Sequence, residues 1–170
     1  MNGAVTEPTG SVTAPFIPYR IGVTDVPPEY GKHRYLTKGE ASVFLTRNWQ
    51  MQEATQYAYR LYKRLMYYTC ERPEKFLPEV TETLVAFEQA MIDEQPRIER
   101  TAELLYEAGE DDLAAEYLTF YSNTKALDAL DLGNALVDSL EARTKVLYGI
   151  REPVANATGG LSGGVNCQVE

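Results

Sequence analysis

Hydrophobic residues recur at intervals of three and four positions through the central part of the chain. The first stripe consists of Ala54, Tyr57, Ala58, Leu61, Tyr62 and Leu65. Because an α-helix completes a turn in 3.6 residues, this spacing places the whole stripe on one helix face. We predict an amphipathic helix that ends before Pro73, since proline disfavours helical geometry in the residue before it.

A second stripe lies further along the chain and consists of Val80, Leu84, Phe87, Met91, Ile98 and Leu105. Pro96 lies inside it and lacks the backbone N–H that a helix interior uses, so we expect a kink or a break there. Gly109 follows the stripe and predicts its end, because glycine readily adopts the left-handed conformation that closes many helices.

The third stripe consists of Leu113, Tyr117, Leu118, Tyr121, Ala126, Leu127, Leu130, Leu136, Val137, Leu140 and Leu147. Asp111 or Asp112 is expected to cap the start of this helix, because a short acidic side chain can accept from its first N–H groups. We expect the helix to restart at Ser122 or Asn123 and to close at Gly149. Three or four amphipathic helices of this length predict a mainly α fold, an antiparallel helical bundle or a set of hairpins.

The two ends of the chain differ from its centre in composition. Residues 1–40 are rich in proline, glycine and threonine, and they predict one or two short extended segments. Residues 151–170 combine glycines with small polar residues and predict a flexible tail. The helical domain is therefore expected over residues 41–150.

The chain carries a net charge of −9, from 16 basic and 25 acidic residues. This balance argues against nucleic acid or an anionic membrane as a partner, because both attract cationic surfaces. No apolar run approaches the roughly 20 residues of a membrane span. The N-terminus has neither the basic nor the apolar part of a secretory signal, so we expect a cytoplasmic protein.

Few residues could carry chemistry on their own. His33 is the only histidine, which excludes a multi-histidine metal site, and a surface turn or packed ring is favoured over a small anion site with Lys32 and Arg34. Cys70 lies near the end of the first predicted helix, where the helix dipole disfavours a thiolate. We predict a structural Cys70 and an incidental Cys167, with no disulfide framework, no metal and no cofactor.

Four segments of the chain resemble, in order, segments of the C69 (formerly U34) family of dipeptidases. Three of them are residues 16–27, which read FIPYRIGVTDVP, residues 87–99, which read FEQAMIDEQPRIE, and residues 115–123, which read AEYLTFYSN. The remaining segment joins Asn48-Trp49 to the tyrosine-rich helix that follows. The order and approximate spacing of these segments resemble those of the family, and the resemblance covers about residues 14–148.

The resemblance implies part of an N-terminal-nucleophile hydrolase, in which β-sheets lie between helices. In such an enzyme the first residue of the mature chain is a cysteine, and its free amino group helps as base. Short peptides are hydrolysed through a thioester, and an oxyanion hole stabilises the tetrahedral intermediate. This sequence begins Met1-Asn2-Gly3, and neither Cys70 nor Cys167 matches the nucleophile position.

The chain therefore resembles only the C-terminal, largely helical half of the family, and it is expected to be inactive alone. The implied partner is a nucleophile-bearing N-terminal half, or a second copy through self-association, with a short peptide as substrate only in the complete enzyme. Apolar surface is expected to be exposed where the missing sheet docks. A non-catalytic helical protein-interaction module is the alternative, and an enzyme that uses Cys70 is a third possibility.

No catalytic residue is carried over from the family. Tyr19, Thr24 and Asp25 of the first segment are candidates for the substrate side of the cleft in the complete enzyme. The competing interpretation is structural, because Thr24-Asp25 before a pair of prolines is ordinary turn chemistry and could tie the segment to the helices.

Overall fold

The stripes of the central region fold into three helices, in a computed structural model that describes residues 14–20, 22–30 and 57–148. The helices are α3 (Ala58–Glu71), α4 (Pro73–Glu107) and α5 (Asp111–Tyr148), preceded by the 3₁₀ helix η1 (Pro28–Tyr30). Within these ranges there is no strand, and the prediction of a mainly α fold is confirmed. The described residues exclude the predicted boundaries at residues 40 and 150, the tail over 151–170, and His33, Asn48, Trp49, Gly149 and Cys167.

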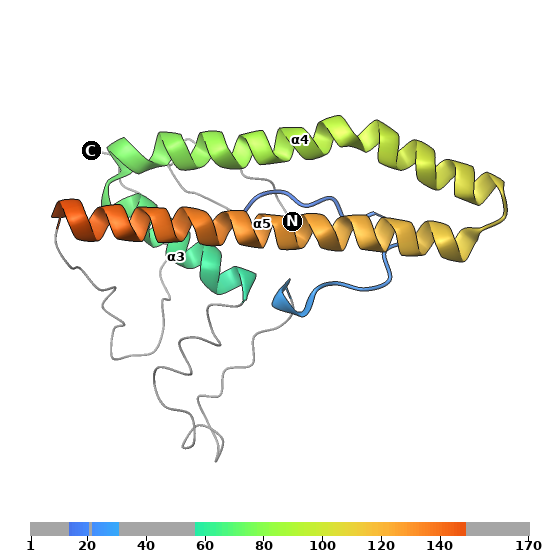
Figure 1. The fold of residues 1–170 in the computed structure, drawn as a ribbon, viewed down its shortest axis with the longest axis horizontal. Helices are drawn as coiled ribbons and strands as arrows, with labels where there is room; N and C mark the ends of the chain where they lie inside the picture. The colour runs from blue at the N-terminus through green and yellow to red at the C-terminus, as the bar shows by residue number, and fades with distance from the viewer. Residues whose placement is uncertain (1–13, 21, 31–56, 149–170) are drawn as a thin grey trace, which may run out of the picture.

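Helices α4 and α5 form a long antiparallel hairpin that turns at Gly109 (Figure 1). Gly109 has a φ of 78°, its N–H donates to the carbonyl of Tyr106, and the N–H of Glu110 donates to the carbonyl of Leu105. These two bonds satisfy carbonyls that the end of α4 would otherwise leave unpaired. The predicted role of Gly109 as the residue that ends the helix is confirmed.

Helix α4 continues through both of its internal prolines, Pro78 and Pro96. The break that Pro96 allowed does not occur, and the helix axis instead changes direction in its second half (Figure 1). Pro96 and Ile92, one turn earlier, are both exposed. Water can therefore hydrogen-bond to the carbonyl that proline leaves unpaired, which makes a bend cheaper than a break.

Helix α5 is uninterrupted, so the expected restart at Ser122 or Asn123 is wrong. Ser122 is fully buried, and its hydroxyl donates to the carbonyl of Pro18 in the N-terminal segment rather than to a helix end. Asp111 and Asp112 lie in the first turn of α5 instead of preceding it. Their carboxylates are placed to interact with the positive end of the helix dipole.

Helix α3 packs against α5 and α4 through the largest core cluster. Its buried members are Ala58, Leu61, Leu65, Tyr68, Phe76, Val80, Leu84, Leu130, Leu136, Val137 and Leu140. Gly133 permits the close approach of α3 to α5, because a Cβ there would lie 2.9 Å from Cδ2 of Leu61 and 3.3 Å from Cε1 of Tyr62. The first helix ends before Pro73, as the sequence predicts.

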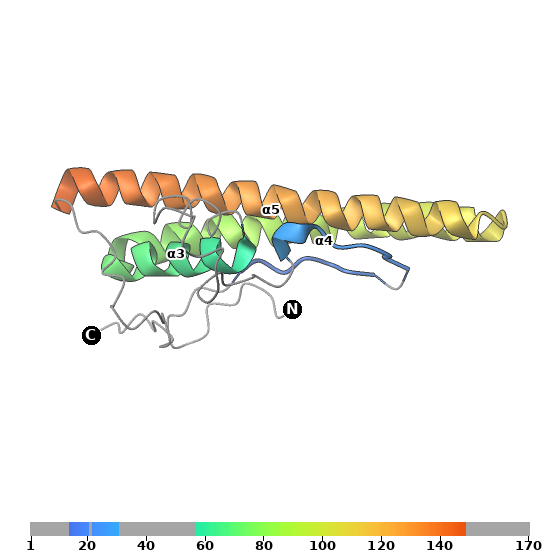
Figure 2. The ribbon, with the colours of Figure 1, turned by 90° about the horizontal axis from the view of Figure 1, so that it is seen from below.

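One face of α5 remains uncovered by the described residues. Leu113, Phe120 and Leu127 follow one another at intervals of seven and are 48%, 72% and 42% exposed. Leu113 and Leu127, together with the exposed Leu147, were expected on the inner face, and that expectation is wrong. Figure 2 shows why: α3 and the N-terminal segment lie together on one side of α5. Among the described helices, none is both long and apolar enough to span a bilayer.

The N-terminal segment runs extended along the same side of the hairpin as α3 and reverses direction once (Figure 2). Residues 14–20 form its first arm and residues 22–27 its second arm. A bond of 3.2 Å from the N–H of Val23 to the carbonyl of Arg20 closes this turn, and Gly22 has a φ of 106°. The predicted extended character is therefore present without a strand. Ile17 anchors the first arm, being 3% exposed and packed with Ala126 and Ala129 of α5.

Candidate functional site

Polar contacts fasten the first arm of the segment to α4. The backbone N–H of Phe16 donates to a carboxylate oxygen of Glu88 at 2.6 Å. Four residues later, Nη1 of Arg20 pairs with Oε1 of Glu99 at 2.7 Å. Both acceptors belong to one helix and lie eleven positions apart, close to three turns, so they follow one face of α4. The segment is thus held along that face at two points.

Helix α5 holds both arms through hydroxyl groups. The buried hydroxyl of Ser122 donates to the carbonyl of Pro18 at 3.0 Å. Beyond the turn, the N–H of Thr24 donates to Oγ1 of Thr119 at 3.0 Å. Backbone groups without secondary-structure partners need such side-chain partners when they leave water.

Two partly buried tyrosines complete the attachment where the segment meets α3. The hydroxyl of Tyr30 donates to the carbonyl of Ala126 at 2.7 Å, and that of Tyr62 donates to the carbonyl of Ala129 at 2.8 Å. Burial raises the pKa of Tyr30 to about 12 and raises that of Tyr62 as well. Both phenols therefore stay neutral over the physiological range, as a structural donor requires.

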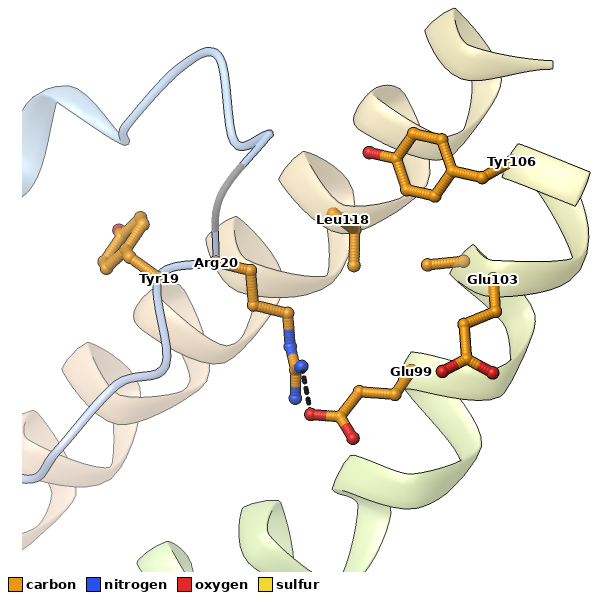
Figure 3. Close-up of a pocket in the computed structure, with 7 residues that line it drawn as sticks. Tyr19, Arg20, Glu99, Glu103, Tyr106 and Leu118 are labelled. Carbon is orange, nitrogen blue, oxygen red and sulfur yellow. Dashed lines mark hydrogen bonds and ion pairs between the residues drawn. The ribbon is translucent and has the colours of Figure 1, made fainter. Parts of the chain in front are cut away.

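An open pocket of about 470 Å³ lies between the turn and the tip of the hairpin (Figure 3). Its lining consists of Tyr19, Arg20, Glu99, Ala102, Glu103, Tyr106 and Leu118. The turn approaches this pocket closely, because a Cβ on Gly22 would lie 3.2 Å from the hydroxyl oxygen of Tyr106. Sequence positions about a hundred residues apart thus form one site only after folding.

Most of the surface that lines the pocket is apolar, and its charged groups are one guanidinium, of Arg20, and two carboxylates, of Glu99 and Glu103. The hydrogen bond from Arg20 is the largest cause that holds the pKa of Glu99 below its ordinary value, so this carboxylate is ionised at neutral pH. Glu103 extends from the same helix (Figure 3) and pairs at 3.3 Å with Arg100 outside the lining. These groups can hold charged or hydrogen-bonding parts of a ligand. The lining contains no cysteine, serine or histidine that could act as a nucleophile or base.

The structure separates the three candidate site residues. Tyr19 lines the pocket, and its hydroxyl is buried without a hydrogen-bond partner in the described part of the chain. Burial raises the pKa of this phenol. Thr24 is bonded to Thr119, and the carboxylate of the exposed Asp25 accepts from the N–H of Val26 at 2.9 Å. Thr24 and Asp25 are absent from the pocket lining; Thr24 fastens the second arm to α5, and Asp25 bonds, within the described residues, only to its neighbour in the chain.

Sequence reasoning missed the residues that define the pocket, namely Arg20, Glu99, Glu103 and Tyr106. Glu99 is the last residue of the resembling segment 87–99, but no periodicity in the sequence connects it to Arg20, which lies 79 positions away. The only sequence signal for this pair was that residues 16–27 and residues 87–99 carry side chains of opposite charge. That signal is weak in a chain in which charged residues make up 24% of the sequence.

Cys70 is disulfide-bonded in the structure, so the expectation that the cysteines form no disulfide is wrong for this residue. The only other cysteine in the sequence is Cys167, which lies outside the described residues. A sulfur held in a disulfide is not a thiolate nucleophile, which argues against an enzyme that uses Cys70. The described residues contain no cluster of side chains suited to a metal ion.

No protein-family model, curated protein or solved structure matches this chain. A function is therefore proposed from the geometry of the segment and the pocket. The main feature of this geometry is that residues 16–27, 87–99 and 115–123 lie against one another, with the pocket at one end of their contact.

Proposed function

We propose that this chain is the C-terminal, nucleophile-free portion of a C69-type cysteine dipeptidase. A second portion, with a cysteine as its first residue, supplies the thiolate and the free amino group that acts as base. Together they hydrolyse short peptides through a thioester. This chain holds the extended segment and its pocket at the edge of the cleft.

One observation carries this proposal: the segments that resemble the family are the segments that contact one another. Five polar contacts each join two of them, and the pairs are Phe16–Glu88, Arg20–Glu99, Pro18–Ser122, Thr24–Thr119 and Glu94–Tyr121. The hairpin by itself brings residues 87–99 and 115–123 together, but it gives residues 16–27 no reason to lie on both of them if the match is chance. Stretches from one ancestral fold meet because their residue types are those that hold the fold together.

The chemistry of the pocket is compatible with a peptide terminus. Arg20 offers donors to a carboxylate, and Glu99 and Glu103 offer acceptors to an ammonium group. Tyr19 and Tyr106 present aromatic rings beside these charges. In this proposal the pocket orients one end of the substrate, while bond cleavage depends on the cysteine of the other portion.

Reconstitution tests the proposal. The full chain is mixed with the nucleophile-bearing N-terminal half of a C69 dipeptidase, and release of amino groups from dipeptides is followed. Activity is expected from the pair and from neither component alone. The control is the same half with its first cysteine replaced by alanine, which is expected to bind and to remain inactive. Absence of a complex, or a complex without activity, contradicts the proposal.

One observation favours the alternative, a non-catalytic helical protein-interaction module. Leu113, Phe120 and Leu127 are exposed, and none of them lines the pocket, so a catalytic portion docked at the pocket leaves this stripe unexplained. In the interaction module this stripe is the binding face. Phe120→Ser then abolishes association with a partner while the free energy of unfolding stays within about 0.5 kcal/mol.

A further inference from the structure

The pocket near the tip of the hairpin has apolar walls from both long helices. Ala102 of α4 and Leu118 of α5 are buried and line it. A Cβ on Gly22 would lie 3.2 Å from the hydroxyl oxygen of Tyr106 and 3.7 Å from Cδ1 of Leu118, so these two side chains lie close together beneath the turn. The pocket has the size of a small-ligand site and is open to solvent, so a small molecule can reach these walls.

Arg20, the only cation of the lining, is poorly available to an anionic ligand. Its Nη1 lies 2.7 Å from Oε1 of Glu99, and its side chain is 17% exposed. Its Nε is buried, without a hydrogen-bond partner among the described residues. A ligand carboxylate would therefore have to replace Glu99 at the guanidinium, which exchanges one charge-assisted pair for another and gains little.

Glu103 is the carboxylate of the lining that is least neutralised. Arg100, which lies outside the lining, pairs with it at 3.3 Å and with Glu107 at 3.8 Å, so one guanidinium serves two exposed carboxylates. Exposed pairs of this kind are weak. Residues 99–116, around the tip of the hairpin, carry seven acidic side chains and one basic side chain, that of Arg100. The excess of negative charge attracts a cation to this side of the pocket.

Tyr106 offers a cation a second contact. It lines the pocket three positions after Glu103, and residues three apart lie on the same side of a helix. Its side chain is partly exposed, and the face of an aromatic ring attracts an ammonium group within about 6 Å of its centre. Figure 3 shows both side chains extending from α4 on the same side of the pocket. An ammonium group can thus meet a carboxylate and a ring beside the apolar walls.

We propose that the pocket binds the ammonium end of a peptide, with Glu103 as the acceptor and Ala102 and Leu118 against the first side chain. This inference rests on the proposed function, which supplies the peptide, and it specifies which end of that peptide the pocket holds. The ammonium group and the first side chain of a peptide are attached to the same carbon atom. Such a ligand therefore presents a cation and an apolar group together, as the lining requires.

Three leucine derivatives test the choice of ligand on the full chain alone. Leucinamide carries an ammonium group, N-acetylleucinamide carries no charge, and N-acetylleucine carries a carboxylate. Binding is followed by NMR of the ¹⁵N-labelled chain at about pH 6.5, below the pKa of roughly 7.7–8.0 of an α-amino group. Leucinamide is expected to shift the amide signals of Ala102, Glu103 and Tyr106 with a dissociation constant on the order of 1 mM.

The two acetylated compounds are expected to bind at least about tenfold more weakly than leucinamide, because each lacks the ammonium group. N-acetylleucinamide that binds as well as leucinamide overturns the proposal, since the charge would then contribute nothing. Tighter binding of N-acetylleucine assigns the pocket to the carboxylate end and overturns it as well. Leucinamide that leaves the signals of the pocket residues unchanged also contradicts it.

A matched pair of variants tests the role of Glu103. Glu103→Gln keeps the size of the side chain and removes its charge, and it is expected to weaken leucinamide binding roughly threefold. Glu82→Gln is the control, since Glu82 is an exposed glutamate of the same helix outside the lining, and it should leave binding unchanged. Equal affinities of the two variants show that Glu103 is not the acceptor and overturn the assignment.

The two proposals fail in different ways. If leucinamide binds at the pocket but reconstitution gives no active pair, the dipeptidase function is wrong and the ammonium site stands. If the pair cleaves dipeptides while leucinamide leaves the pocket signals of this chain unchanged, the ammonium site is wrong and the dipeptidase function stands.

Discussion

The hydroxyl of Ser122 donates a 3.0 Å hydrogen bond to the carbonyl oxygen of Pro18, a residue 104 positions earlier in the chain. Ser122 lies in the interior of α5, where a serine is otherwise a mediocre helix former. Ser122 instead contributes to the tertiary structure, because its buried hydroxyl pairs with a backbone carbonyl of the extended segment. The segment that lines the pocket is thus positioned by a residue on the helix surface beneath it.

Ser122→Ala is expected to lower the free energy of unfolding by about 1–2 kcal/mol, because the Pro18 carbonyl loses its partner. Urea denaturation followed by circular dichroism measures the change. Ser139→Ala is the control, since Ser139 is an exposed serine of the same helix, and it should change stability by less than about 0.5 kcal/mol. Equal effects of the two substitutions contradict a special role for Ser122.

Gly133→Val is expected to lower the free energy of unfolding by about 1–3 kcal/mol, because a side chain there meets Leu61 and Tyr62 of α3. Asn134→Val places the same residue at the next, less buried position and is the control. Thermal or urea unfolding of both variants gives the comparison. A Gly133 variant as stable as its control would falsify the close approach of α3 to α5.

The partly buried tyrosines predict a loss of stability at alkaline pH. Tyr30 has a folded-state pKa raised to about 12 from an ordinary value of 10.0. Between these values the unfolded chain has lost the proton and the folded chain still keeps it, so the free energy of unfolding falls as pH rises. Urea denaturation between pH 9 and pH 12, roughly the span around these pKa values, measures the fall. It should be shallower in Tyr30→Phe and unchanged in Tyr59→Phe, whose ring is exposed.

The ion pair at the pocket predicts a local titration change. Arg20→Ala is expected to raise the pKa of Glu99 toward its ordinary value, because the largest cause of its lowering is removed. Carbon-detected NMR titration of the glutamate carboxyls measures this shift. Arg100→Ala is the control, since Arg100 pairs with Glu103 and not with Glu99. An unchanged Glu99 in the Arg20 variant means that the pair does not form in solution.

The disulfide at Cys70 predicts that its thiol is blocked in the native protein. Iodoacetamide should leave Cys70 unlabelled until a reductant is added, and peptide mass spectrometry gives the readout. Labelling without reductant contradicts the disulfide and restores Cys70 as a candidate nucleophile.

Local patterns predicted the helices well, because their causes are local. The spacing of apolar residues placed α3, α4 and α5, and Gly109 marked the turn between two of them. The restart at Ser122 was predicted wrongly for the same reason. Judged from its neighbours in the sequence alone, a serine suggests the start of a helix. The actual hydrogen-bond partner of Ser122 is Pro18, which lies in a distant part of the chain.

The pocket could be predicted only in part. Tyr19 was a candidate and lines it, whereas Thr24 and Asp25 were candidates and do not. Arg20 and Glu99 were not predicted, because a pair 79 residues apart leaves no periodic trace in the sequence. The exposure of Leu113 and Leu127 was also missed, since the side of a helix that is covered depends on what packs against it.

By itself, the sequence determined which residues form helices, where the hairpin turns and that the N-terminal region runs extended, since each depends on neighbours a few residues away. Only the tertiary structure decided that this segment lies across α4 and α5, that Arg20 meets Glu99 and that one face of α5 stays bare. Those outcomes depend on contacts between residues far apart in the chain. Hydrophobic and polar patterns specify which face of an element is to be covered, but packing selects the element that covers it.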